Sequence, residues 1–159
     1  MVVALYSYEN QSLFWENNLS NTTFFKNIKS TLFNKEITLI DKKHDVFWLK
    51  NNAVFKINGG SGKIEFEKEN VNSIAINKNK DVIYLFTTNT LEEKLKRETS
   101  ITAYSTTNMK PLWDKPIIVR GAFKDVAFDN KKIIVITSRG FNIITPCLLY
   151  TSPSPRDRG

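Results

Sequence analysis

Few residues of this chain have the chemistry of a catalytic or metal-binding site. Its 159 residues include one histidine, His44, and one cysteine, Cys147. His44 stands next to Asp45, and an imidazole beside a carboxylate is a pair that can transfer protons. A zinc site or a nucleophilic triad needs several such groups together. We therefore expect His44 to be a solvated turn residue, and we assign no catalytic residue, no metal ligand and no cofactor.

The segment 58–63, Asn-Gly-Gly-Ser-Gly-Lys, has the composition of a phosphate-binding loop. A P-loop requires the spacing GxxxxGK followed by Ser or Thr, placed between a strand and a helix. The spacing here is different, and the segments on both sides are typical of strands. We predict an ordinary turn between two strands.

Three large aromatic residues, Trp15, Phe66 and Trp113, follow one another at intervals of 51 and 47 residues. Each ends a segment in which a short strand, a polar turn and a second strand succeed one another, as in a β-hairpin. An exposed aromatic ring can stack on a ligand ring or a base. An aromatic residue that recurs at one position of a repeated unit is better suited to filling space between units. We predict that these three residues dock neighbouring units on one another.

A second sequence pattern, besides the aromatic hairpins, occurs three times: a short strand, a polar turn and a more apolar strand. The three segments begin at residues 37, 73 and 125, and they read ITLIDKKHDVFWLK, SIAINKNKDVIYLF and DVAFDNKKIIVIT. The turns start at Asp41, Asn77 and Asp129, whose side chains can hydrogen-bond nearby backbone amides. The strands after the turns are apolar nearly throughout, which is typical of strands covered on both faces.

Together the two patterns predict thirteen strands in antiparallel units of four, repeated every 40–50 residues, and this is the signature of β-propeller blades. The predicted fold class is all-β, a partial β-propeller of about three four-stranded blades, open at both ends. The blade parts are expected at residues 2–16, 37–67, 73–115 and 125–145. Residues 111–113 form the expected fourth strand of the third unit. Residues 2–6 and 141–145 are expected to be unpaired edge strands.

A surface insert is expected at residues 88–100, inside the predicted blade at residues 73–115. Thr90 and Glu93 have the spacing of a capping box, and Glu92 with Lys96 and Glu93 with Arg97 are i,i+4 ion pairs. These features predict a surface helix of one to two turns. The alternative is a charged loop, because isolated helices this short are marginal in water.

One hairpin resembles a known repeat. Ala103-x-Ser105-x-x-Asn108-Met109-x-x-x-Trp113 is similar to the tryptophan-docking motif of PQQ-like (quinoprotein-type) propeller repeats, Ala-x-Asp-x-x-Thr-Gly-x-x-x-Trp. In the hairpin that ends at Trp15, the matching places hold Leu5, Ser7, Asn10, Gln11 and Trp15. In the hairpin that ends at Phe66, they hold Lys56, Asn58, Ser61, Gly62 and Phe66. No copy has the Asp, and two lack the Gly. The signatures of WD40-like and kelch-type repeats do not recur.

The resemblance implies a non-enzymatic propeller scaffold whose loops bind a protein or a ligand, in the periplasm or outside the cell. It also implies an alternative, a fragment of a quinone-dependent dehydrogenase. Such an enzyme would bring a catalytic Asp, calcium ligands and an aromatic floor for the quinone, and none of these can be placed in this sequence.

The chain carries a formal charge of +7, made mostly by lysines spread through the predicted turns. A nucleic acid or an anionic membrane surface calls for clustered basic residues. We therefore expect no nucleic-acid partner, and polyanion or membrane-surface binding is a second alternative. No apolar run approaches the roughly 18 residues of a membrane-spanning helix.

The C-terminal residues differ in character from the rest. Cys147 and the ten residues after it read CLLYTSPSPRD, which resembles a translated transposase adapter from sequencing libraries. We expect residues 147–159 to be a non-native tail, so that the single cysteine supports no redox or metal chemistry and the gene continues beyond Pro146.

Overall fold

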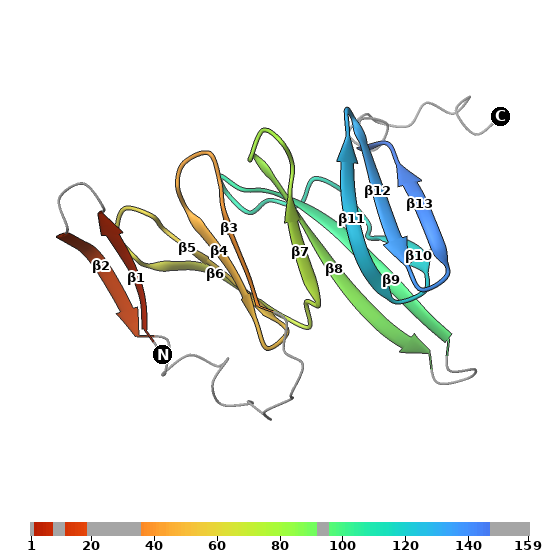
Figure 1. Cartoon of the computed structure of the whole chain (residues 1–159), viewed down its shortest axis with the longest axis horizontal. Coiled ribbons are helices and arrows are strands. Elements are labelled where there is room, and N and C mark those ends of the chain that lie inside the picture. The colour runs from red at the N-terminus through yellow and green to blue at the C-terminus, as the bar shows by residue number, and fades with distance from the viewer. Residues whose placement is uncertain (1, 8–11, 19–35, 92–95, 147–159) are drawn as a thin grey trace. The chain divides into compact units, whose positions relative to one another are not determined.

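The structure is a computed structural model, and it describes residues 2–7, 12–18, 36–91 and 96–146. These residues form thirteen β-strands and no α-helix (Figure 1). The chain divides into two compact units, residues 1–74 and 75–159, with the boundary inside strand β7.

The first unit contains two antiparallel sheets. Strands β1 and β2 form a two-stranded sheet, and β3 to β6 form a four-stranded sheet in chain order. Their bounds are Val2–Ser7, Ser12–Asn18, Ile37–Ile40, Val46–Lys50, Ala53–Ile57 and Ile64–Glu69. One face of the four-stranded sheet buries Trp48, Phe55 and Ile57 in a single cluster. Side chains two residues apart share a face of a strand, so the apolar runs of β4 and β5 supply buried groups to both faces.

The turns of this sheet follow from local side-chain chemistry. Asn51 and Asn52 adopt φ angles of 50° and 62° and join β4 to β5 in a two-residue hairpin. Asparagine tolerates this left-handed region better than other non-glycine residues. In the turn between β3 and β4, Asp41 Oδ1 accepts hydrogen bonds from the amides of Lys43 and Asp45, both at 2.9 Å. The predicted role of an acidic or amide residue at the start of this turn is confirmed.

The second unit contains a four-stranded and a three-stranded antiparallel sheet. The strands are arranged in the order β10-β9-β8-β7 in the first of these sheets and β11-β12-β13 in the second. In chain order, strands β7 to β13 span Ser73–Ile76, Val82–Leu91, Lys96–Ser105, Ile117–Arg120, Phe123–Asp129, Lys132–Thr137 and Gly140–Ile144. In the turn between β7 and β8, Asn77 Oδ1 accepts hydrogen bonds from the amides of Asp81 and Val82, much as Asp41 does in the first unit.

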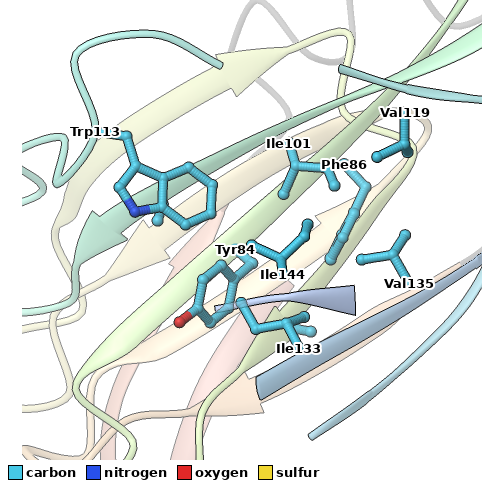
Figure 2. Close-up of a cluster of buried hydrophobic side chains, with 10 residues drawn as sticks. Tyr84, Phe86, Ile101, Trp113, Val119, Ile133, Val135 and Ile144 are labelled. Carbon is cyan, nitrogen blue, oxygen red and sulfur yellow. The ribbon is translucent and has the colours of Figure 1, made fainter. Parts of the chain in front are cut away.

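A continuous apolar core lies between the two sheets of the second unit (Figure 2). The four-stranded sheet contributes Tyr84, Phe86 and Ile101, and the three-stranded sheet contributes Ile133 and Val135, among others. The ring of Phe86 stacks on that of Phe123 in β11 at a centroid distance of 4.3 Å. Successive antiparallel meanders packed face to face are the blades of a propeller. The chain is thus an all-β protein, a partial β-propeller, as the sequence predicted.

Two local predictions are wrong. The expected surface helix is instead a continuation of the β8–β9 hairpin, in which Thr90 pairs with Arg97 and Leu91 with Lys96. Residues 92–95, which include the predicted capping residue Glu93, lie outside the described residues. The expected fourth strand at residues 111–113 makes only a single bridge, from Pro111 to Tyr104. The fourth strand is β10, which pairs with the extended part of β9.

The two described hairpins of the aromatic motif have the same turn. The amide of Asn58 donates to Lys63 O and that of Gly62 to Asn58 O, both at 2.8 Å. The amide of Ser105 donates to Lys110 O at 3.0 Å and that of Met109 to Ser105 O at 2.9 Å. The Gly position of the motif is occupied by Gly62 in the first of these hairpins and by Met109 in the second. Their φ angles are 72° and 54°. The glycine of the motif therefore serves a left-handed backbone position.

Replacing Met109 by glycine should stabilise the protein. A non-glycine residue in the left-handed region is less favourable by roughly 1–2 kcal/mol, although glycine loses more chain entropy on folding. We expect a net gain of roughly 0.5–1 kcal/mol in the free energy of unfolding, measured by urea denaturation. Gly62→Ala is the matched control and should destabilise. A loss of stability in Met109→Gly would contradict the equivalence of the two turns.

Candidate functional site

The predicted docking residues occupy different environments. The Trp113 side chain is 8% exposed and belongs to the core of the second unit. Its ring lies 5.9 Å from Tyr84, whose ring in turn lies 5.6 Å from Phe128 of β11. Phe66 is half-buried in β6, opposite Lys56. The Trp15 side chain lies outside the described residues. The blade-docking role of all three stays a prediction.

The histidine and the glycine-rich segment both lie in turns between strands. His44 is exposed in the β3–β4 turn, while Asp45 is buried and turned toward the sheet. The amides of Gly60 and Ser61 donate to Asn58 Oδ1, both at 2.9 Å, so they are used inside the turn. Within the described ranges, no group of three or more His, Cys, Asp or Glu residues could hold a metal ion.

A buried lysine is the main feature that sequence reasoning missed. Lys56 lies in β5 with its side chain 2% exposed, and its Nζ lies 3.4 Å from Asp45 Oδ2 and 3.2 Å from Glu65 Oε2. Asp45 Oδ1 also accepts a hydrogen bond from the amide of Gly59 at 2.9 Å. A Cβ on Gly59 would lie 2.0 Å from the carbonyl oxygen of His44, so the two turns pack backbone against backbone. The only sequence signal was a charged residue inside the apolar run AVFKI.

A pocket in the second unit is a candidate ligand site. We call it the turn pocket, because the β7–β8 and β11–β12 turns enclose it. Its volume is about 410 Å³, within the range of small-molecule sites. Tyr84 and Phe128 contribute aromatic rings, and Val82, Ile133 and Pro146 add apolar surface. Polar residues complete the lining: Asn77, Lys78, Asn79, Asp81, Asn130, Lys131 and Lys132.

The turn pocket is positively charged. Lys78, Lys131 and Lys132 are exposed, and none of them forms an ion pair with another described residue. Asp81, the one carboxylate among the described lining residues, accepts a hydrogen bond from Asn77 Nδ2 at 2.6 Å. Three ammonium groups around a partly aromatic floor favour an organic anion. The lysines come from turns about fifty residues apart, so the sequence alone did not indicate that they meet.

Comparison with known proteins does not identify a family for this chain. No protein-family model matches the chain, and no curated protein sequence matches it. Among solved structures, it is similar to BamB from Moraxella catarrhalis, with a TM-score of 0.40 and 9% sequence identity. The match covers 91% of this chain and 55% of that chain, so this chain spans about half the length of that structure. In the part of the chain that the structure describes, no helix is long and apolar enough to cross a membrane.

Proposed function

We propose that the chain is a non-enzymatic propeller scaffold that binds a protein or a small ligand through its loops, outside the cytoplasm. The turn pocket is the observation that supports a binding role, since it joins the turns of two adjacent blades into one site. The extracytoplasmic location rests on the resemblance of the hairpins to PQQ-like repeats. The non-enzymatic role rests on the same resemblance.

The chemistry of the turn pocket defines its ligand class as a small organic anion with a flat apolar body. The ammonium groups of Lys131 and Lys132 attract a phosphate or a carboxylate from solvent. Tyr84 and Phe128, whose rings are tilted by 39° to each other, offer apolar surface to the body of the ligand. Neither feature alone would select this class, because exposed lysines also bind inorganic ions.

Phenyl phosphate is a suitable probe, with phenol and inorganic phosphate as its two halves. We expect calorimetric titration of the full chain to show tighter binding of phenyl phosphate than of either half. The double substitution Lys131→Ser with Lys132→Ser should weaken binding about tenfold, which corresponds to about 1.4 kcal/mol. The matched control is Lys115→Ser with Lys124→Ser, two exposed lysines that do not line the pocket.

Three results would count against this proposal. Equal affinity for phenol and phenyl phosphate, or equal affinity in both double variants, would show that the lysines of the turn pocket do not hold an anion. Quinone-dependent dye reduction in the presence of calcium would replace the non-enzymatic role by the dehydrogenase alternative.

A further inference from the structure

The pair Asn58–Gly59 is the one place in the sequence where an asparagine directly precedes a glycine. Such a pair can cyclise: the backbone nitrogen of the glycine attacks the side-chain carbonyl carbon of the asparagine, and no side chain on the glycine obstructs the approach. The bond between Cγ and Nδ2 breaks, and ammonia leaves with the proton that the glycine nitrogen gives up. Water then opens the succinimide ring to aspartate or isoaspartate. The pair is therefore a candidate site of spontaneous covalent modification.

Both polar atoms of the Asn58 side chain are held in the turn between β5 and β6. Its Oδ1 accepts hydrogen bonds from the amides of Gly60 and Ser61, both at 2.9 Å, and its Nδ2 donates to Glu65 Oε1 at 2.8 Å. Ring closure brings Cγ within bonding distance of the Gly59 nitrogen and expels Nδ2. The reaction therefore displaces the side chain from all three partners.

The attacking nitrogen is held as well. Gly59 is buried, and its amide donates to Asp45 Oδ1 at 2.9 Å. Asp45 is fixed in turn by Lys56, whose Nζ lies 3.4 Å from Asp45 Oδ2. The carbonyl oxygen of His44 would lie 2.0 Å from a Cβ on Gly59, so the β3–β4 turn packs directly against this glycine. The closed turn thus fixes the positions of both reacting groups.

We propose that Asn58 is a modification site controlled by the fold, which cyclises with Gly59 only in the fraction of molecules whose β5–β6 turn has opened. Local openings occur throughout native proteins, and turns with solvent-exposed hydrogen bonds are among the segments that open most readily. The rate of modification then equals the rate in an unfolded chain multiplied by the open fraction. The inference goes beyond the proposed binding role and does not depend on the turn pocket, which belongs to the second unit.

The modification would weaken the turn that controls it. An aspartate at this position has no hydrogen to donate to Glu65 Oε1, so two carboxylates would meet where a hydrogen bond now lies. Isoaspartate would in addition lengthen the backbone by one methylene group. The substitution Asn58→Asp reproduces the first product, and we expect it to lower the midpoint of urea denaturation of the full chain.

The test compares the full chain with the free peptide of residues 54–67, VFKINGGSGKIEFE, at neutral pH and physiological temperature. Proteolytic digestion and mass spectrometry at successive times measure the conversion of Asn58. We expect conversion to be at least about tenfold slower in the folded chain, because opening breaks several hydrogen bonds at once. The full chain unfolded in urea should react at the rate of the peptide.

Two substitutions of Glu65 test the bond to Nδ2 directly. Glu65→Ala removes the acceptor and should speed the conversion of Asn58 about fivefold. Glu65→Gln keeps an acceptor oxygen and should react more slowly than Glu65→Ala. Ser61→Ala is the matched control in the same turn, because it keeps the backbone amide that donates to Asn58 Oδ1, and it should leave the rate unchanged.

Equal rates in the folded chain and the peptide would overturn the proposal, because the turn would then not restrain the reaction. A faster rate in the folded chain would also overturn it, and would show that Asp45 acts as a base on the Gly59 amide. So would a Glu65→Ala variant that reacts no faster than Ser61→Ala. None of these results bears on the binding of phenyl phosphate in the turn pocket.

Discussion

Trp113→Ala should lower the free energy of unfolding by about 3–5 kcal/mol, the usual cost of truncating a buried large aromatic residue. The indole is 8% exposed and contributes to the core between the two sheets of the second unit (Figure 2). Its removal leaves Tyr84 without the ring that lies 5.9 Å away. Urea denaturation of the full chain, followed by circular dichroism, measures the effect.

Trp113→Phe separates packing from hydrogen bonding. The indole Nε1 is buried and has no hydrogen-bond partner among the described residues. Phenylalanine keeps a ring against Tyr84 and removes this unsatisfied donor, so we expect a much smaller loss than with alanine. Ile118→Ala, at a 52% exposed position, is the surface control.

A double-mutant cycle tests whether Trp113 docks one blade on the other. Trp113, between β9 and β10, and Phe128 of β11 share Tyr84 as a neighbour, and the cycle combines Trp113→Ala with Phe128→Ala. Residues coupled in this way show interaction energies of about 0.5–3 kcal/mol. Additive effects, or a cost below about 1 kcal/mol for Trp113→Ala alone, would refute the docking hypothesis.

Features set by local chemistry could be predicted from the sequence. The turn residues Asp41 and Asn77 and the hairpin residues Asn51 and Asn52 act through bonds and φ angles within a few positions of themselves. The short apolar β-branched runs between such turns can only be strands, because each is too short for a buried helix. Strand order followed because short connections make successive strands neighbours.

The surface helix was predicted wrongly because its evidence was also local. Ion pairs spaced i,i+4 stabilise a helix by only about 0.2–0.5 kcal/mol each. Strands β8 and β9 pair along ten residues each, from Val82 with Ser105 to Leu91 with Lys96. This pairing extends a hairpin already anchored in the core, and the extended β9 then provides the edge on which β10 forms. Tertiary context outweighed the local preference.

The two charged surfaces of the second unit depend on contacts between distant segments. Lys78 meets Lys131 and Lys132 only because the β7–β8 and β11–β12 turns lie at the same end of two packed sheets. Arg97 and Arg139 line one groove at the other end of these strands for the same reason. Composition gave the net charge of the chain, but the clustering of that charge follows from strand register, which a single sequence does not reveal.

Lys56→Met should destabilise the protein about as much as Trp113→Ala, by about 3–5 kcal/mol. This is expected although methionine is apolar and similar in length to lysine. The substitution removes the cation that lies 3.4 Å from Asp45 Oδ2 and 3.2 Å from Glu65 Oε2. Asp45 is buried, so its carboxyl group would be left in a poorly solvated place without its counter-ion. Guanidinium denaturation of the full chain measures the loss.

Lys50→Met is the matched control, because Lys50 of the same sheet also pairs with a glutamate. Its Nζ lies 3.6 Å from Glu36 Oε2, and both side chains are partly solvated. Ion pairs of this kind contribute about 0–1 kcal/mol. A Lys56→Met cost no larger than that of Lys50→Met would show that Asp45 and Glu65 do not depend on the buried cation.

Neutralising the partners should reverse most of the Lys56→Met effect. In the triple variant with Asp45→Asn and Glu65→Gln, no buried charge is left without a counter-ion, and the amide oxygen of the introduced asparagine can still accept the hydrogen bond from the amide of Gly59. Replacing a whole buried ion pair by uncharged groups is often neutral, whereas removing one partner is costly. A triple variant as unstable as Lys56→Met would instead assign the loss to altered packing around the methionine, and not to the unpaired carboxylates.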